Sequence, residues 1–143
     1  MKIVVISDTH IPVAADGIPR KIREQIKDCD FTVHAGDVTE MYVIEELRHF
    51  AETYAVRGNM DSPEVKKALP EKLIFEANEK IIGIVHGHGP FSNAIEAARK
   101  AFKGKTPDVV IFGHSHLPFS EVIGNTLFFN PGSVSDRMFS PYR

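Results

Sequence analysis

Two histidines separated by one residue, His114 and His116, follow directly after an apolar run at residues 109–112. Gly113 stands between the run and the pair, which indicates that the chain turns there instead of continuing as a strand. Two imidazoles at the exit of a buried strand are metal ligands, a catalytic pair or ordinary polar loop residues. The pair alone does not decide among these interpretations, so the other polar clusters must be considered with it.

Six apolar runs each end in a short polar cluster that contains glycine or a potential ligand. These clusters occupy residues 7–10, 34–37, 57–61, 86–88, 113–116 and 130–133. In open α/β sheets, ligands bind outside the carboxyl ends of the strands, so clusters that follow strands of one direction meet at one edge. Asp, His and Asn repeated at this kind of position are typical of a functional site rather than of unrelated loops.

The donor atoms in these clusters are carboxylate oxygens, imidazole nitrogens and one amide oxygen, without any thiolate. Seven residues are candidate metal ligands, namely Asp8, His10, Asp37, Asn59, His86, His114 and His116. This donor set suits Mn²⁺, Fe²⁺, Zn²⁺, Ni²⁺ or Co²⁺ better than Ca²⁺ or an iron–sulfur cluster. Seven ligands are too many for one ion, whereas two ions sharing one carboxylate would use them all. Two divalent ions with only two carboxylates form a cationic pocket, which favours a phosphate ester.

The length of 143 residues predicts a single domain, and 43% hydrophobic with 25% charged residues is typical of a globular protein. The one cysteine, Cys29, excludes an intrachain disulfide and fits a reducing compartment. A net charge of −2 argues against bulk electrostatic binding to nucleic acid or anionic membranes. Because no apolar run is as long as the core of a signal peptide or a membrane-spanning helix, we expect a cytoplasmic protein.

The elements that must position these clusters alternate in the first half of the chain, in the order βαβαβ. Strands are predicted at residues 3–6, 31–33 and 53–56. The first helix begins near Pro19 and buries Ile18, Ile22 and Ile26. Thr39 is the predicted N-cap of the second helix, which buries Val43, Ile44, Leu47 and Phe50, and Ser62-Pro63 predicts a short third helix.

The second half of the chain is rich in predicted hairpins. Runs at residues 72–77 and 80–85, separated by Asn78-Glu79, predict one hairpin, and residues 121–123 and 126–129 predict another. Between them lie a helix over about residues 92–103, ended by Gly104, and a strand at residues 109–112. The combination predicts an α/β core extended by antiparallel strands.

The order of the motifs resembles that of the calcineurin-like metallophosphoesterases. The matching motifs are Asp8-x-His10, Gly36-Asp37, Gly58-Asn59-x-Asp61, His86 and Gly113-His114-x-His116. The chain is most similar to the small, cap-less phosphodiesterase branch found in bacteria and archaea, from Asp8 to about Ser133. The resemblance implies a single domain over residues 1–143, folded as a four-layer α/β/β/α sandwich of two mixed sheets flanked by helices.

The resemblance also implies a division of the ligands between two metal ions. One ion is held by the residues matching Asp8, His10, Asp37 and His116, and the other by those matching Asp37, Asn59, His86 and His114, with Asp37 bridging. Mn²⁺ is the first expectation, with Ni²⁺, Co²⁺, Fe²⁺ or Zn²⁺ as alternatives. The implied reaction is hydrolysis of a small-molecule phosphate diester by in-line attack of a hydroxide bridging the ions, without a covalent phosphoenzyme.

Two departures from the family pattern affect these expectations. Met60 stands where many members have a histidine that acts as a general acid, so the leaving-group acid is undefined and His88 becomes a catalytic candidate beside Asp37 and Asn59. The chain also ends soon after residue 133, which leaves either a smaller sheet or an edge for a partner to cover.

Several neighbouring residues have supporting roles in this hypothesis. Asp61 is expected to cap the short helix or to support a ligand, and His34 to pack near the site. His49 is expected to be exposed, and Arg57 and Arg137 are candidate phosphate contacts.

Other functions remain open. A small relative in membrane-trafficking coats has this fold and is thought to act mainly as an interaction module, so a non-catalytic protein-interaction scaffold is the main alternative. A phosphomonoesterase or a nuclease of the same family is another. A homo-oligomer is possible, whereas nucleic acid and membrane partners are not indicated.

Overall fold

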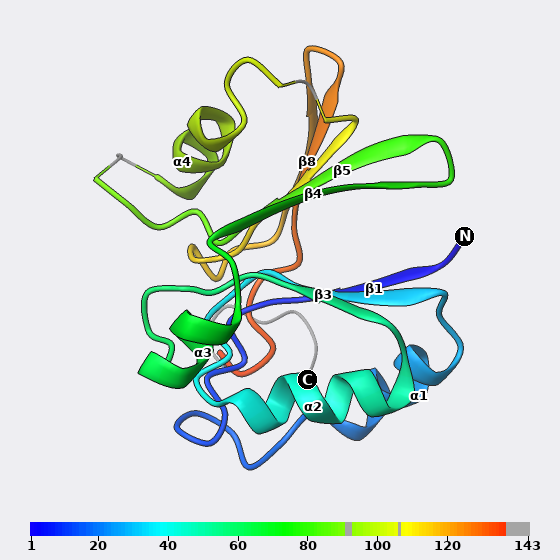
Figure 1. Ribbon diagram of the computed structural model, residues 1–143, viewed down its shortest axis with the longest axis vertical. Coiled ribbons are helices and arrows are strands. Elements are labelled where there is room, and N and C mark those ends of the chain that lie inside the picture. The colour runs from blue at the N-terminus through cyan, green and yellow to red at the C-terminus, as the bar shows by residue number, and fades with distance from the viewer. Residues whose placement is uncertain (91–92, 106, 137–143) are drawn as a thin grey trace.

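The computed structural model describes residues 1–90, 93–105 and 107–136, and it has two sheets between outer helices (Figure 1). The first sheet contains β1 (Ile3–Ile6), β2 (Phe31–His34) and β3 (Thr53–Ala55) in the order β1-β2-β3. Among the described residues this sheet is entirely parallel, where a mixed sheet was expected. The reason is that helices connect its strands, and such crossovers return the chain in the same direction.

The second sheet is mixed and has the order β4-β5-β6-β8-β7. Its strands are β4 (Lys72–Ala77), β5 (Lys80–Val85), β6 (Val109–Ile111), β7 (Phe119–Ile123) and β8 (Thr126–Asn130). Both predicted hairpins are confirmed, because β4 pairs antiparallel with β5 and β7 pairs antiparallel with β8. In contrast, β5, β6 and β8 run parallel to one another. The expected α/β/β/α fold is therefore confirmed.

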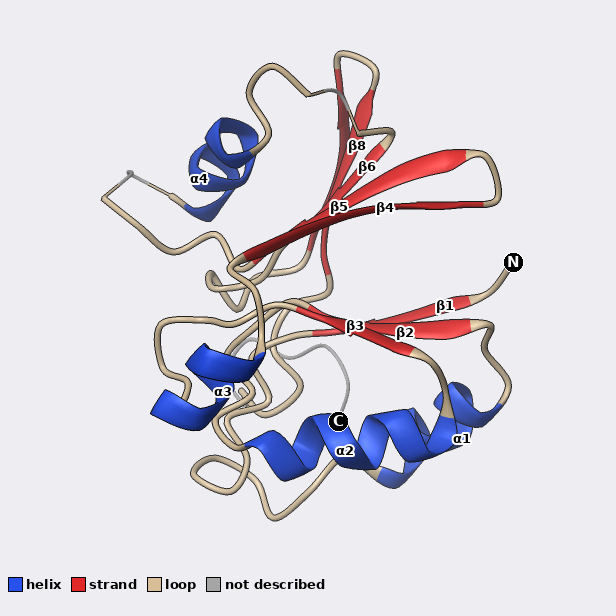
Figure 2. Cartoon of the chain, in the orientation of Figure 1, coloured by secondary structure: helices blue, strands red, loops and turns tan. Residues whose placement is uncertain are grey.

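On the outer side of the first sheet lie α1 (Arg20–Lys27) and α2 (Met41–Phe50), with the shorter α3 (Pro63–Ala68) nearby (Figure 2). The side chain of Ser62 caps α3 by accepting a hydrogen bond from the Val65 N–H at 3.4 Å. The predicted cap of α2 is wrong by one residue, because Glu40 occupies the N-cap position. Thr39 is in the left-handed region at φ 80°, whereas an N-cap residue has an extended backbone.

The outer face of the second sheet is covered by α4 (Ala94–Ala101), which is shorter than the predicted range. Asn93 caps this helix by accepting a hydrogen bond from the Glu96 N–H at 2.9 Å. Ser92, where the helix was predicted to begin, lies outside the described residues. Among the residues that are described, no helix is both long enough and apolar enough to cross a membrane.

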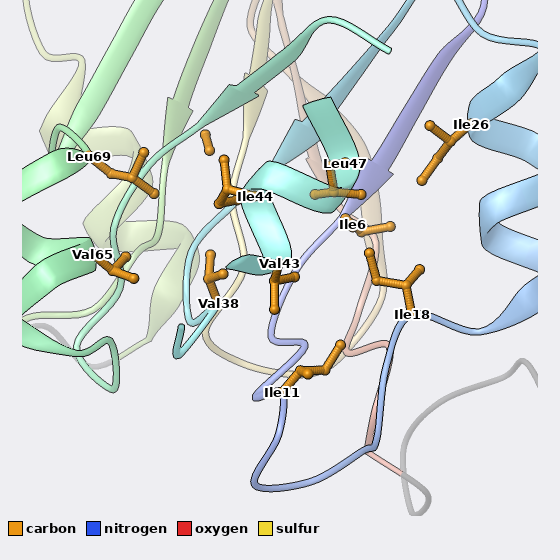
Figure 3. Close-up of a cluster of buried hydrophobic side chains, with 11 residues drawn as sticks. Ile6, Ile11, Ile18, Ile26, Val38, Val43, Ile44, Leu47, Val65 and Leu69 are labelled. Carbon is orange, nitrogen blue, oxygen red and sulfur yellow. The ribbon is translucent and has the colours of Figure 1, made fainter. Parts of the chain in front are cut away.

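In the described part of the chain, three separate hydrophobic clusters fill the spaces between the four layers. The first packs α1 and α2 against β1 and contains Ile6, Ile26, Val43, Ile44 and Leu47 among others (Figure 3). The second lies between the sheets, and the third lies between the second sheet and α4. Strand alternation produces this division, since successive side chains point to opposite faces. In β6, for example, Val109 faces the other sheet and Val110 faces α4.

Within the described residues, β1 has no strand partner on the side away from β2. A largely apolar groove of about 860 Å³ runs beside β1, between α1 and the chain around β7 and β8. The expectation that an edge is left for a partner to cover is compatible with this groove and stays a prediction.

Candidate metal centre

The six polar clusters follow β1, β2, β3, β5, β6 and β8. The first three strands are mutually parallel, and so are the last three. Six of the seven candidate ligands come together in two groups at these strand ends. We call Asp8, His10 and His116 the first ligand group, and Asp37, His86 and His114 the second ligand group. Within each group, one potential ligand atom from every residue lies within 4.8 Å of the others.

The buried carboxylate of Asp8 uses its two oxygens differently. Its Oδ2 accepts hydrogen bonds from the hydroxyl of Ser7 at 2.5 Å and from the N–H of His114 at 3.0 Å. Its buried Oδ1 has no hydrogen-bond partner among the described residues and lies 3.3 Å from Nε2 of His116 and 3.9 Å from Nε2 of His10. One oxygen thus anchors the side chain, and the other faces the histidines.

Asp37 repeats this arrangement and faces both ligand groups. Its Oδ1 accepts a hydrogen bond from the Met60 N–H at 2.8 Å. Its Oδ2 lies 3.2 Å from Nε2 of His86 in its own group and 3.9 Å from Nε2 of His10 in the first group. Burial favours the protonated acid, but the His86 imidazole and the Met60 N–H outweigh it and lower the pKa of Asp37 to about 2.

His86 is fully buried and oriented by the backbone. Its Nδ1 lies 2.8 Å from the carbonyl oxygen of Ala35, and because a carbonyl only accepts, Nδ1 carries the hydrogen. Its Nε2 approaches Asp37 but forms no hydrogen bond in this geometry. Burial lowers the pKa of His86, but contact with Asp37 and the charge of Asp8 outweigh burial, so the pKa is raised. His86 therefore presents Nε2 to the cluster.

His116 is oriented by a side chain instead. Its Nδ1 lies 2.9 Å from Oδ2 of Asp136, and its Nε2 faces Asp8. Contact with Asp8 is the main cause that raises the pKa of His116 to about 9, and burial opposes it. Burial has the larger effect at His114, where it lowers the pKa together with the nearby His86.

The backbone at the candidate ligands is unusual, because most of them are in the left-handed region. The φ angles are 52° at Asp8, 46° at His10, 54° at Asp37, 67° at His114 and 58° at His116. Residues other than glycine adopt this region rarely and at a cost in free energy, and such residues cluster at functional sites. The same conformation at five of seven candidates supports a functional cluster rather than chance proximity.

Two glycines allow the carboxylates to be approached closely. A Cβ atom on Gly58 would overlap the carboxylate of Asp37, and a Cβ on Gly113 would overlap the hydroxyl of Ser7 and crowd Asp8. Any larger residue at either position would push a carboxylate out of place.

Asp61 connects two loops beside the candidate ligands, and its predicted support of a ligand stays a prediction. Its Oδ1 accepts a hydrogen bond from the Thr39 N–H at 2.7 Å, and its Oδ2 accepts one from the Gly58 N–H at 2.6 Å. Asp61 thereby joins the loop after β2 to the loop after β3, whereas Ser62 caps the short helix.

His34 connects the loop that carries Asp8 with the loop that carries Asp37. Its Nδ1 accepts a hydrogen bond from the Gly36 N–H at 3.2 Å, and its Nε2 lies 3.0 Å from Oγ1 of Thr9. Gly36 precedes Asp37 and Thr9 follows Asp8, so this buried side chain contacts a neighbour of each carboxylate. Burial lowers the pKa of His34 to about 3, which keeps the imidazole neutral.

The remaining predicted residues lie around this centre. Asn59 is exposed and follows Gly58, which packs against Asp37. The ring of His88 lies 5.5 Å from that of His86 and 6.3 Å from that of His114. Its buried Nδ1 has no hydrogen-bond partner in the part of the chain that the structure describes.

Met60 is 61% exposed, and His49 is exposed on α2 as predicted. Arg57 is engaged at α3, where it donates to the Lys66 carbonyl at 2.7 Å and lies 3.6 Å from Glu71. Arg137 lies outside the described residues.

Sequence reasoning missed two charged residues at the centre. Asp136 contacts His116, although it stands 20 residues away in the chain. Lys66 donates through Nζ to the carbonyl of Asn59 at 2.9 Å. The only sequence signal for Asp136 is its position three residues after the last polar cluster, and a lysine on a short helix carries no signal.

The donor set fits two divalent cations. It offers two carboxylates and four imidazoles in two groups, with Asn59 adjacent as a seventh candidate. Within residues 1–90, 93–105 and 107–136, the buried Oδ1 of Asp8 and Nε2 of His86 have no hydrogen-bond partners, and both face the cluster. Unpaired buried polar atoms are costly in free energy, and a cation in each ligand group would satisfy the unpaired atom of that group.

The four-layer fold and the paired Asp/His groups at its strand ends define a metal-binding α/β protein of the phosphoesterase class. Residues 1–142 match the calcineurin-like phosphoesterase superfamily domain, and the chain belongs to this family. The resemblance inferred from the motifs is thereby confirmed.

Relatives and solved structures agree with this family. A protein of Methanocaldococcus jannaschii named "probable metallophosphoesterase" is 36% identical over 135 residues, which are 93% of this chain and 68% of the relative. A phosphodiesterase of the same organism is 32% identical over 92% of this chain and 83% of its own length. The structure of wild-type Vps29 from Entamoeba histolytica, complexed with Zn²⁺, has a TM-score of 0.76 and 25% identity, covering 100% of this chain and 79% of that chain.

Proposed function

We propose that the protein is a phosphodiesterase that uses two divalent metal ions, with Mn²⁺ as the first expectation. Asp8, His10, Asp37 and His116 would hold one ion, and Asp37, Asn59, His86 and His114 the other. The observation that carries this proposal is the position of Asp37, whose Oδ2 faces a histidine of each ligand group at 3.2 and 3.9 Å. A carboxylate in this position can bridge two ions.

Two bound divalent ions would supply Lewis acidity toward the phosphate oxygens and lower the pKa of water. The chain's own residues prepare the centre for this chemistry. The low pKa of Asp37 keeps its carboxylate ionised at neutral pH, and the Nδ1 contact with Ala35 aims Nε2 of His86 at the cluster. Lys66 places an ammonium beside the backbone of Asn59, one of the proposed ligands.

We assign His88 to the substrate rather than to a metal ion, because its ring lies beside His86 and His114 but belongs to neither ligand group. Met60 cannot donate a proton to a leaving group. The centre should therefore favour diesters whose leaving group departs without strong acid assistance.

Hydrolysis of two model esters tests this proposal. With Mn²⁺, the protein should hydrolyse bis(p-nitrophenyl) phosphate faster than p-nitrophenyl phosphate, and EDTA or Asp37→Asn should abolish both activities. Asp108→Asn is a matched control, because Asp108 is an exposed carboxylate that pairs with Lys80 away from the site. Diester hydrolysis that persists with EDTA and in Asp37→Asn would contradict the proposal. Faster hydrolysis of the monoester would instead favour a phosphomonoesterase, and cleavage of oligonucleotides a nuclease.

A protein-interaction scaffold is the second candidate. It is favoured by the similarity to Vps29 and by Met60, an exposed apolar residue next to the centre in place of the usual histidine. Under this hypothesis the protein binds a partner stably and shows no turnover with Mn²⁺, Ni²⁺, Co²⁺ or Zn²⁺. Turnover that depends on Asp37 would exclude a purely structural role.

A further inference from the structure

The segment at residues 131–136 follows β8 and wraps around the exit of β1. The hydroxyls of Ser133 and Ser135 donate to the carbonyl oxygen of Asp8 at 2.8 and 3.0 Å. The N–H of Val134 donates to the carbonyl oxygen of Ser7 at 3.2 Å. Three hydrogen bonds thus fix this segment against the backbone that carries Asp8.

Asp136 is the last described residue of this segment and reaches a second loop. Its Oδ2 lies 2.9 Å from Nδ1 of His116, and its own N–H donates to the hydroxyl of Ser133 at 3.0 Å. The hydrogen bond to Ser133 fixes the backbone of Asp136, and the carboxylate of Asp136 contacts the imidazole of His116. The segment connects the Asp8 loop with the His116 loop, and both loops contribute to the first ligand group.

The chemistry of this contact determines which nitrogen of His116 faces the cluster. An ionised carboxylate only accepts hydrogen bonds, so Nδ1 of His116 carries a hydrogen and Nε2 is left to face Asp8 at 3.3 Å. A carboxylate on the outer nitrogen of a ligating histidine also fixes the plane of the ring and makes the inner nitrogen a stronger ligand. At His86 the carbonyl of Ala35 provides orientation without a full charge.

We propose that Asp136 is a positioning residue that selectively sets the metal affinity of the first ligand group through His116. This inference rests on the proposed two-ion centre. Within the described part of the chain, Asp136 contacts His116 of the first ligand group, and His86 of the second group has its own backbone anchor. Loss of Asp136 should therefore weaken the binding of one ion and leave the binding of the other unchanged.

Titration of the full chain with Mn²⁺, following free Mn²⁺ by electron paramagnetic resonance, tests the proposal. Wild type should bind two ions, and Asp136→Ala should bind one of them 10- to 100-fold more weakly, the usual effect of removing a partner of a ligating histidine. Asp136→Asn can still accept the hydrogen bond but lacks the charge, so its loss should be smaller. Asp136→Glu should restore part of the affinity, and Asp108→Asn should match wild type.

Histidine ¹H–¹⁵N spectra of the Zn²⁺-loaded protein give a second readout that a purely structural role would not change. The Nδ1–H proton of His116 should be observed in wild type and in Asp136→Asn, and it should exchange rapidly in Asp136→Ala. Equal affinities in wild type and all three variants, or an equal loss at both ions, would overturn the Asp136 proposal alone. Fewer than two bound Mn²⁺ ions in wild type would overturn the two-ion centre, and the Asp136 proposal with it.

Discussion

The two ligand groups contain the same residue types but are built differently. In the second group, His86 is fully buried and anchored by the Ala35 carbonyl, and Asp37 is anchored by the Met60 N–H. In the first group, the side chains of His10 and His116 are 17% and 28% exposed. His116 depends on the side chain of Asp136, which comes from the last part of the described chain.

The second ligand group is thus held mainly by the backbone of the fold, whereas the first ligand group is completed by a polar side chain. Backbone anchors at the strand ends form whenever the sheets form, so Asp37 and His86 of the second ligand group are part of the protein core. Side-chain anchors at partly exposed positions are worth less and open more easily. We therefore expect the ion of the first group to exchange faster, although His114 gives the second group one exposed member.

Substitution of a buried and of a partly exposed histidine should have the most unequal effect on folding stability. His86→Ala removes the buried partner of Asp37, and leaving a buried charge without its partner costs about 3–5 kcal/mol in unfolding free energy. His116 is partly exposed although its partner Asp8 is buried, so His116→Ala should cost less, about 1–3 kcal/mol. Urea unfolding in EDTA measures both values. Similar losses in the two variants would show that the groups are equally embedded.

Metal binding should separate the neighbouring histidines His114 and His116, which belong to different groups. His114→Ala should weaken the binding of one Mn²⁺ ion, and His116→Ala should weaken the binding of the other. Each variant should lose at least about 100-fold in affinity, because removing only the hydrogen-bond partner of a ligating histidine already costs up to about 100-fold. Titration of each variant and of the double variant by electron paramagnetic resonance gives the affinities. Loss of the same ion in both variants would mean that the two histidines share one site.

His34 should make stability dependent on pH for both groups together, because it contacts a neighbour of each carboxylate. Its pKa is about 3 in the folded protein and about 6.5 in the unfolded chain, so below pH 6.5 the unfolded chain binds the proton first. Stability therefore falls with falling pH, and His34 accounts for about 2 kcal/mol between pH 7 and pH 5.

Urea unfolding in EDTA at these two pH values should show a smaller difference for His34→Gln than for wild type. The exposed His49 provides the control, because His49→Gln should leave the pH dependence unchanged. An unchanged difference in His34→Gln would mean that His34 titrates similarly in the folded and unfolded protein.

The smallest expected effect is a gain of activity at the position of Met60. A positioned general acid contributes ~10²–10⁴-fold, and an unsupported histidine at this exposed position should provide about tenfold. Met60→His should accelerate the hydrolysis of diesters with alkyl leaving groups more than that of p-nitrophenyl diesters, because the p-nitrophenyl leaving group needs no acid. Comparison of kcat for both substrate types, with Met60→Gln as the control, measures this difference. An equal acceleration of both types would argue against proton donation.

Much of the fold could be predicted because strand alternation and turn residues are local signals. Both hairpins and the convergence of the strand-end clusters follow from the order of apolar runs and polar residues. The Thr39 cap was wrong because a side chain 22 residues away, Asp61, holds its N–H. A distant partner of this kind, like Asp136 for His116, leaves no local pattern in the sequence.

The conformation of the ligands was equally hidden from sequence reasoning. Aspartate and histidine adopt a left-handed backbone more often than most residues do, but neither indicates it as strongly as glycine. Only the tertiary contacts of the loops impose it.

The left-handed backbone at five candidate ligands has a consequence for how such a chain can drift during evolution. At these positions glycine or asparagine would relieve the backbone, so selection for stability alone would replace the histidines and aspartates. Their presence here is what continued selection for chemistry would maintain. In a descendant that keeps the fold only as a platform for partners, these positions should be among the first to relax toward glycine.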